Sequence, residues 1–304
     1  MNKTTFEYIE PRRTFWARHL IHRMVRGLKK RGMNVTKYRL CAFPNDLIGR
    51  EIAVAGAYEA AGTKAVKWLC EHHIIENPQE RAFLDIGANV GVYAVALAPY
   101  FAGVLAFEPH PVARQILALN VSINALSNIS LFDYGLSDSD MTADLFEGTA
   151  DNLGASSVER GVGEGKKYCV TLRHATRAIR QATNMRICFI KIDVEGHEPK
   201  VLTGLSSLLA DQQPVVAFEA NDPAHNQDLS EQLAKLGYTK FLALDWSPTI
   251  RHLWLRVLVL TLTGIRSTLK PVANLAGKKY SLVFALPAAA AKRWHELVEP
   301  KNLR

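Results

Sequence analysis

The chain has 304 residues, of which 48% are hydrophobic and 22% are charged, so it is long and apolar enough to bury one sizeable globular core. Its four cysteines match no metal-binding spacing, which argues against a zinc ribbon and suits a reducing compartment. The net charge of +8 is unevenly distributed: residues 1–40 hold 11 basic and 2 acidic residues, residues 41–245 hold 16 and 25, and residues 246–295 hold 8 and none. We therefore expect an acidic central domain between two basic flanks.

The first basic flank has the spacing of an amphipathic helix over residues 13–31. Leu20, Met24 and Leu28 fall on one face of such a helix, and arginine and lysine occupy the others. The pattern is typical of a helix on an anionic membrane surface or of one that covers the core, with nucleic-acid binding as a third interpretation. The first 25 residues contain no continuous apolar run, so we expect no secretory signal and a cytoplasmic location, peripheral to the membrane if the arm binds lipid.

A ligand-binding turn is predicted after a helix that spans about residues 59–76. An apolar strand ends in Asp85 and is followed by a turn that contains Gly87, Asn89 and Gly91, after which an apolar helix begins. Glycines let the backbone reverse tightly and leave no side chain between the main chain and a ligand. The turn therefore predicts close contact between backbone and ligand.

A second apolar strand, residues 104–107, ends at Glu108. A carboxylate about 20 residues after a glycine turn can accept hydrogen bonds from both hydroxyls of a ribose. The chain lacks the Gly-x-Gly-x-x-Gly of dinucleotide-binding proteins and the glycine-lysine loop that binds triphosphates. Its order, Asp-x-Gly-x-Asn-x-Gly, resembles motif I of class I S-adenosylmethionine-dependent methyltransferases, with Glu108 as the ribose-binding acid.

The next predicted elements return the chain to the same edge of the sheet. A helix is expected to end near Ile123, and a third strand is expected over residues 129–134. Leu136 follows that strand, where topology would place an adenine ring. Residues 141–172 are then predicted to form an antiparallel excursion with a glycine-rich turn.

The fourth predicted strand, residues 187–193, leads into the densest polar cluster of the chain: Asp193, Glu195, His197 and Glu198. Ligands of open parallel sheets bind beyond the carboxyl ends of the strands, and Glu219 is expected to end the fifth strand there as well. An alcohol acceptor needs a general base, which His197 or Asp193 could supply. The alternatives are that His197 caps the next helix or faces solvent and that Asp193 serves a turn. The carboxylates could also hold a divalent metal, but we expect none.

Several segments together resemble the FkbM-type methyltransferase family: Leu84–Gly91, Phe107–Pro111, Leu136–Asp138, Pro214–Glu219 and, most specifically, Ile190–Glu198. The resemblance implies an α/β, Rossmann-like, seven-stranded and mostly parallel sheet whose last strand is antiparallel. It also implies that S-adenosylmethionine is held by Asp85, Gly87, Asn89, Gly91 and Glu108, to which topology adds Leu136. The same resemblance implies that the acceptor is bordered by Asp193, Glu195, His197 and Glu198. One departure is Arg173-His174, which stands where the family usually has Asp after Leu172.

The resemblance implies O-methylation of a sugar, glycan or other natural-product hydroxyl. The fourth strand ends in Asp193-Val-Glu-Gly rather than Asn/Asp-Pro-Pro-Tyr/Phe, which argues against methylation of nucleic-acid bases. Two other functions remain open: an RNA methyltransferase that uses the basic arm, and a non-catalytic, membrane-associated nucleoside-binding module. A homo-oligomer is also left open.

The second basic flank is an insertion over residues 247–277 with an apolar run at residues 253–262. The run is too short to cross a bilayer, which needs about 20 apolar residues. It could be a lid, a dimer contact, a buried helix or an interfacial helix. In the last case residues 250–265 and residues 13–31 would contact the membrane together, and a lipid-linked glycan would be a suitable acceptor.

The predicted organisation is a basic arm, one catalytic domain and a short tail. A helix over 224–236 and strands over 240–245 and 280–286 complete the sheet. The boundaries are 1–49 for the arm, 50–290 for the methyltransferase domain and 291–304 for a polar tail.

Overall fold

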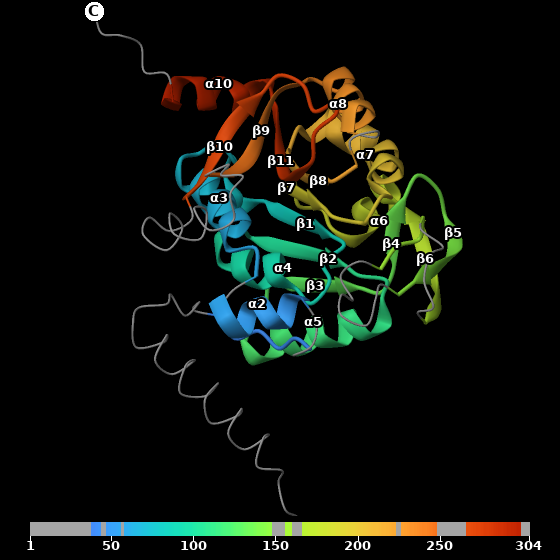
Figure 1. Ribbon diagram of the computed structural model, residues 1–304. Coiled ribbons are helices and arrows are strands. Elements are labelled where there is room, and N and C mark those ends of the chain that lie inside the picture. The colour runs from blue at the N-terminus through green and yellow to red at the C-terminus, as the bar shows by residue number, and fades with distance from the viewer. Residues whose placement is uncertain are drawn as a thin grey trace, which may run out of the picture.

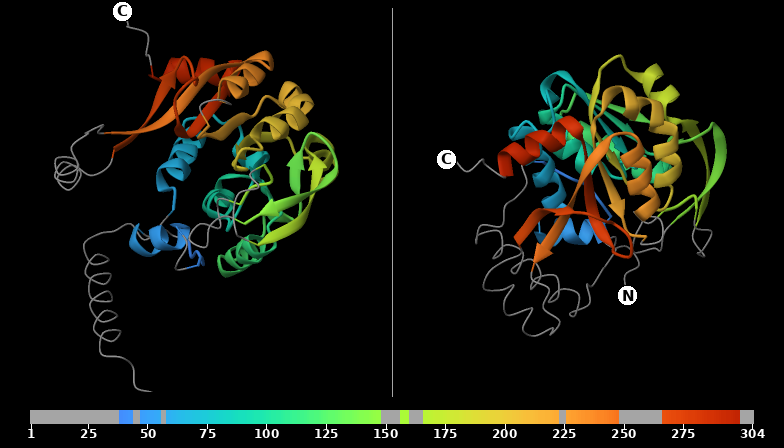
Figure 2. Two further views of the ribbon diagram at one scale, coloured as in Figure 1. Left: turned by 45° about the vertical axis from the view of Figure 1, so that its right-hand side comes forward. Right: turned by 90° about the horizontal axis from the view of Figure 1, so that it is seen from above.

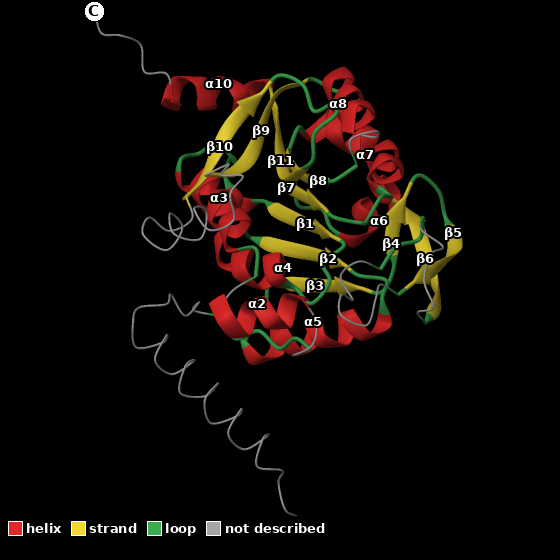
Figure 3. Cartoon of the chain, in the orientation of Figure 1, coloured by secondary structure: helices red, strands yellow, loops and turns green. Residues whose placement is uncertain are grey.

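The computed structural model describes residues 38–43, 47–55, 58–147, 156–159, 166–222, 226–247 and 266–298. They form an eight-stranded sheet covered by helices on both faces, with a three-stranded sheet beside one end of it (Figure 1). Two turned views show the small sheet standing out from the side of the molecule (Figure 2), and a cartoon separates helices from strands (Figure 3).

The strands of the large sheet are β1 (Ala82–Ile86), β2 (Gly103–Phe107), β3 (Ile129–Phe132), β7 (Ile187–Ile192), β8 (Val215–Ala220), β9 (Tyr238–Ser247), β10 (Arg266–Val272) and β11 (Tyr280–Pro287). Their order is β10-β9-β11-β8-β7-β1-β2-β3. The pairs from β8 to β3 are parallel, whereas β11 is antiparallel to both β8 and β9. Every residue of β1, β2 and β7 is buried, as expected for parallel strands covered on both faces.

The predicted Rossmann-like sheet with an antiparallel last strand is confirmed, and one edge strand is added to it. Strand β10 pairs antiparallel with β9 and lies within the insertion expected over residues 247–277. This strand is in the described part of the insertion, and the apolar run at residues 253–262, for which a lid, a dimer contact or a helix is predicted, lies outside the described residues. Pro271 is compatible with a strand there because an edge strand leaves one side of its backbone unpaired.

The helices divide between the two faces of the large sheet (Figure 1). They are α2 (Leu47–Ala55), α3 (Ala60–Glu71), α4 (Val92–Leu97), α5 (Pro111–Ile123), α6 (Ala175–Ala182), α7 (Glu198–Gln212), α8 (Asn226–Lys235) and α10 (Ala288–Val298), with short 3-10 turns at Pro78–Glu80 and Ala98–Tyr100. Helices α2, α3, α4, α5 and α10 contribute to one core cluster, and α6, α7 and α8 contribute to the other. Each face is therefore closed by apolar helix surfaces.

The predicted antiparallel excursion forms the small sheet. Its strands are β4 (Gly135–Ser137), β5 (Met141–Phe146) and β6 (Lys167–His174), in the order β4-β6-β5. Leu145, Val170 and Leu172 form its own small cluster. A bridge between Phe146 and Ser157 adds a short fourth segment beside β5.

The expected domain boundaries fall inside continuous structure. Helix α2 spans the predicted boundary between residues 49 and 50, and Asn120 on α5 hydrogen-bonds to both the amide and the carbonyl of Cys41. The polar tail expected from residue 291 is instead mostly helix α10. Its Trp294 is 4% exposed and packs edge-on against Trp68, because apolar residues four positions apart put one face of α10 into the core.

No helix in the described part of the chain is long and apolar enough to span a bilayer. The two segments predicted to contact a membrane, residues 13–31 and 250–265, lie outside the described residues.

Candidate active site

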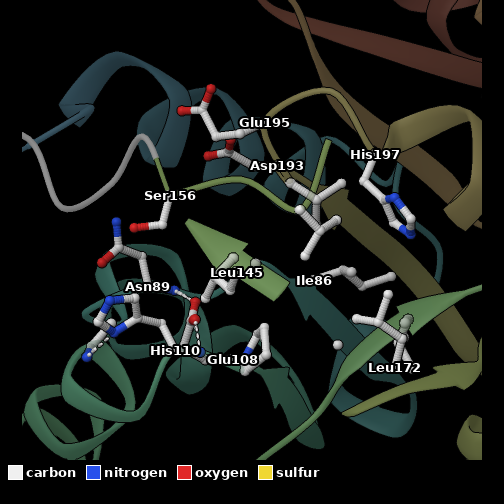
Figure 4. A pocket seen from close by; sticks show the side chains of 17 residues that line it. Ile86, Asn89, Glu108, His110, Leu145, Ser156, Leu172, Asp193, Glu195 and His197 are labelled. Atoms are coloured by element: carbon white, nitrogen blue, oxygen red, sulfur yellow. Dashed lines mark hydrogen bonds between the residues drawn. The ribbon is translucent and has the colours of Figure 1, made fainter. Parts of the chain in front are cut away.

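The carboxyl ends of β1, β2 and β7 open onto one pocket, and its far wall comes from the small sheet (Figure 4). Seven of the ten residues predicted for cofactor and acceptor line the pocket: Gly87, Asn89, Glu108, Leu136, Asp193, Glu195 and His197. Asp85, Gly91 and Glu198 do not line it. The arrangement is the one expected at the carboxyl edge of a parallel sheet.

The turn after β1 has the backbone that its sequence predicted. Gly87 and Gly91 adopt φ angles of 77° and 88°, and Asn89 adopts 50°, all in the left-handed region. A Cβ atom at Gly87 would lie 1.8 Å from the carbonyl oxygen of Asp193. At Gly91 it would lie 2.3 Å from Leu117. Gly87 therefore lets β1 and β7 end side by side, and Gly91 lets α4 approach α5.

Asp85 organises this turn from beneath the pocket. Its carboxyl group is fully buried, and one oxygen accepts a hydrogen bond from the Ala94 amide at 2.9 Å. The other oxygen lies 4.0 Å from the Lys191 ammonium. Burial raises the pKa of Asp85 to about 6, although Lys191 and the Ala94 amide oppose this shift. In this structure Asp85 holds the start of α4 and faces Lys191.

Glu108 is the acidic group of the pocket floor. Its two oxygens accept hydrogen bonds from the amides of Asn89 and His110, each at 2.7 Å. Burial raises the pKa of Glu108 to about 7, and the two amides partly offset that effect. An ionised carboxylate fixed by two amides is well placed to accept hydrogen bonds from a ligand's hydroxyl groups.

Two buried polar atoms of the pocket lack a hydrogen-bond partner among the described residues: Asn89 Oδ1 and His110 Nε2. His110 Nδ1 accepts from the amides of Val112 and Ala113 at the start of α5, so the neutral ring carries its proton on Nε2. Buried polar groups normally have partners, so one acceptor and one donor are left for a polar ligand. His110 had no role predicted from the sequence, although its position before Pro111, which opens α5, could have indicated one.

The opposite end of the pocket is apolar. Leu136 comes from β4, and the small sheet adds Leu145 and Leu172, with Val158 from the bridged segment. An apolar slot beside a carboxylate floor suits a base joined to a ribose. The pocket thus has the polar and apolar ends that a nucleoside requires.

A second group of carboxylates borders the pocket across from Glu108. Figure 4 shows Asp193 and Glu195 projecting together on that side. Carboxylate oxygens of Asp193, Glu195 and Glu219 lie within 4.8 Å of one another, a spacing that could hold a divalent cation. Burial, followed by repulsion from Asp193 and Glu195, raises the pKa of Glu219 to about 9.

The buried ammonium of Lys191 lies beside these carboxylates and offsets part of their charge. The Lys191 ammonium lies 2.9 Å from Asp193 and sits 4.8 Å from the centre of the Tyr93 ring. Burial disfavours the charged ammonium, but Asp193, Asp85 and Glu59 outweigh it and raise the pKa of Lys191. Burial also raises the pKa of Glu59. From the sequence, Lys191 is one of the groups that could offset the carboxylates at the strand ends, whereas Tyr93 was assigned no role and is brought to Lys191 only by the folded structure.

His197 and Glu198 are held in structural contacts. His197 Nδ1 lies 2.8 Å from Glu159, its Nε2 lies 3.0 Å from the Ser137 hydroxyl, and Figure 4 shows the ring turned away from Asp193. The Glu198 carboxylate is buried and accepts hydrogen bonds from the amides of Val194 and Gly196, at 3.0 and 2.9 Å. Of the four residues predicted to border the acceptor, Asp193 and Glu195 are half-buried and line the pocket, whereas His197 and Glu198 are buried.

Known proteins share this region of the sequence. The family profile described as the methyltransferase FkbM domain matches residues 85–240, just over half of the chain. The methyltransferase sdnD of Sordaria araneosa is 27% identical over 165 residues, which are 44% of this chain and 64% of sdnD. The hexuronic acid methyltransferase AglP of Haloferax volcanii is 30% identical over 138 residues, 45% of this chain and 55% of AglP. The chain thus spans less than two thirds of either relative.

Solved structures with a related fold include methyltransferase FkbM from Methylobacillus flagellatus KT, with a TM-score of 0.44 and 16% identity over 81% of this chain and 56% of that one. The METTL16 methyltransferase domain gives a TM-score of 0.46 and 11% identity over 88% of this chain and 79% of its own.

Proposed function

The chain belongs to the FkbM family of class I, S-adenosylmethionine-dependent methyltransferases, and on this premise we propose that it methylates a hydroxyl group of a sugar or glycan. The observation that carries the proposal is that one pocket combines two parts. Its Glu108 floor and its apolar side chains suit a nucleoside, and we call this part the cradle. Asp193 and Glu195 form an acidic border beside it. Family membership implies the methyl donor, and the border supports a hydroxylated acceptor.

The cradle fits S-adenosylmethionine. Glu108 would accept hydrogen bonds from the ribose hydroxyls, and the unpartnered Asn89 Oδ1 and His110 Nε2 would meet its polar atoms. Leu136 and the neighbouring apolar side chains would contact the adenine, with Gly87 and Gly91 shaping the turn. Asp85 would act from below by holding α4 and Lys191. When bound, the cofactor supplies an electrophilic methyl group.

The acidic border supplies the groups that an alcohol acceptor needs. The acceptor hydroxyl must lose its proton as the new C–O bond forms, and a carboxylate within hydrogen-bond reach can take it. Asp193 is our candidate because it borders the pocket and Lys191 fixes its carboxylate. Glu195 and Glu219 would accept hydrogen bonds from neighbouring sugar hydroxyls.

The names of the relatives suggest which class of acceptor is methylated, and the carboxylates around Asp193 narrow that class further. AglP acts on a hexuronic acid by its name. The carboxylates of Asp193 and Glu195, whose oxygens lie within 4.8 Å of each other, would repel an acidic group placed beside them. We therefore propose that the methylated ring is neutral at the reacting hydroxyl, or that any acid group of the sugar points away from Asp193.

Calorimetric titration with S-adenosylmethionine, S-adenosylhomocysteine and NAD is the first test. We expect micromolar binding of both sulfur nucleosides and none of NAD, because the chain lacks the dinucleotide turn. Transfer of radiolabelled methyl groups to neutral and acidic monosaccharide glycosides would follow. Binding of NAD alone would contradict the cofactor, and transfer to RNA but to no glycoside would contradict the acceptor.

A further inference from the structure

A short segment outside the large sheet forms one wall of the pocket. Residues 156–159, which we name the strap, begin beside β5 through the bridge between Ser157 and Phe146. Ser156 and Val158 line the pocket, whereas Ser157 and Glu159 make their contacts away from it. This alternation is the one that an extended chain imposes on successive side chains.

The first anchor of the strap is the Ser157 hydroxyl. It is buried and donates a hydrogen bond of 2.7 Å to the carbonyl oxygen of Glu195 while accepting one of 3.1 Å from the Glu159 amide. Glu195 has a left-handed φ of 51°, which a non-glycine residue adopts only when its surroundings enforce it. Ser157 is thus part of what holds the Glu195 backbone beside Asp193.

The second anchor joins three elements through one imidazole ring. Glu159 Oε1 lies 2.8 Å from His197 Nδ1 and 2.8 Å from the Lys200 ammonium. On the other side of the ring, His197 Nε2 meets Ser137 at the end of β4. Each ring nitrogen therefore has a partner, and the ring is 3% exposed. It ties the strap to α7 and to the small sheet.

The two anchors position Ser156 and Val158 at the pocket. Ser156 lies between Asn89, on the cofactor side, and the Asp193–Glu195 pair, on the acceptor side (Figure 4). Val158 lies with the apolar side chains of the other end. The strap, which is held at both anchors, therefore borders both the cofactor side and the acceptor side of the pocket.

We propose that the strap is a positioning element of the active site and that Ser157, Glu159 and His197 are its anchors. The inference rests on the proposed function and deepens it, because it assigns His197 to cofactor binding through the strap instead of to proton removal. Ser156 and Val158 are then the strap residues that touch the ligands.

The test compares dissociation constants for S-adenosylhomocysteine, measured by calorimetry on the full chain. We expect Glu159→Ala and Ser157→Ala to weaken binding about tenfold. Glu159→Gln keeps an oxygen that can accept from His197 and should restore most of the affinity, which a general loss of stability would not explain. Glu296→Ala is the matched control, because Glu296 is also exposed and pairs with a lysine, but on α10.

His197→Ala separates an anchor from a general base. If His197 is an anchor, His197→Ala should weaken S-adenosylhomocysteine binding about as much as Glu159→Ala does. The double variant should then bind no more weakly than either single variant, because both remove the same contact. A base predicts unchanged binding and lost methyl transfer, and that result would overturn the proposal. So would wild-type affinity in both Glu159→Ala and Ser157→Ala. If the wild-type chain bound no S-adenosylhomocysteine, the proposed function would fail first and the strap assignment with it.

Discussion

At the scale of single residues, the geometry separates groups that face the ligand from groups that hold the loop. Asp193, Glu195, His197 and Glu198 are neighbours in sequence, and three of them line the pocket. The side chains of His197 and Glu198 are nevertheless held by hydrogen bonds to other parts of the chain. The sequence showed that polar groups gather after β7. It could not show their directions, because these depend on Ser137 and Glu159, which are 60 and 38 residues away from His197.

Glu108 is the residue whose replacement tests the ribose assignment most directly. We expect Glu108→Gln to raise the dissociation constant for S-adenosylhomocysteine by about 10- to 100-fold, since a hydrogen bond to a charged group contributes roughly 1.5–3 kcal/mol. Titration calorimetry measures the change, with exposed Glu80→Gln as the control. An unchanged constant would show that the carboxylate does not meet the ribose.

The same carboxyl group should make stability depend on pH. Burial raises the pKa of Glu108 to about 7 in the folded chain, whereas an unfolded glutamate titrates near 4.5. Between these values the folded state holds a proton that the unfolded state has lost. The free energy of unfolding must therefore fall as pH rises from about 4.5 to about 7, by up to roughly 3 kcal/mol from this group alone.

Urea unfolding of the ligand-free protein at pH 5, 6, 7 and 8 measures this dependence. Glu108→Gln should flatten part of the decline. A remaining slope is expected, because the raised pKa of Asp85, about 6, acts in the same direction. A wild-type chain that becomes more stable from pH 5 to pH 7 would contradict the burial of both groups.

At the scale of elements, the site depends on how closely α7 approaches β4. A Cβ atom at Gly204 of α7 would lie 2.1 Å from the carbonyl oxygen of Ser137, and backbone at that distance cannot yield easily. Thr176 on α6 also donates a hydrogen bond of 2.7 Å to the Gly204 carbonyl. The glycine therefore lets three elements meet beneath the His197 contact.

Gly204→Ala is expected to destabilise the fold by about 1–3 kcal/mol, because overpacking outweighs the gain of about 1 kcal/mol in helix propensity. Urea unfolding measures the difference. Ser206→Ala, an exposed position of the same helix, should be neutral or slightly stabilising. Equal stability of the two variants would mean that α7 can move away from β4 without cost.

At the scale of the whole molecule, local sequence patterns predicted the central sheet, whereas features that depend on long-range packing could not be predicted. Continuous apolar strands, a glycine turn and acidic strand ends follow one another in the sequence, so the fold class and the composition of the pocket floor were predictable. Strand β10 and helix α10 were not, since a proline interrupts the first and the second begins with four consecutive alanines, which define no apolar face. Lys191 could be recognised as a possible counter-charge for the carboxylates, but only the assembled sheet shows that it is buried among them.

The basic arm is the part of the molecule whose contribution can be tested by removal. Asn120 of α5 and Asn124, which follows this helix, bind the backbone of Cys41 and Arg39, so a chain that begins at Tyr38 keeps this attachment. We expect this truncated chain to fold and to bind S-adenosylhomocysteine as the full chain does. It should lose binding to vesicles of anionic lipid, because residues 1–37, which it lacks, carry 10 basic and 2 acidic residues.

Vesicle co-sedimentation at low and high salt distinguishes the interpretations of this arm. Vesicle binding by the full chain should weaken as salt screens the charges, and it should disappear in the truncated chain. That result would assign the arm to a membrane surface and favour a lipid-linked acceptor. Equal vesicle binding by both chains would contradict that role. A truncated chain that instead loses salt-sensitive binding to RNA would support the nucleic-acid alternative, because phosphate contacts are released steeply as salt rises.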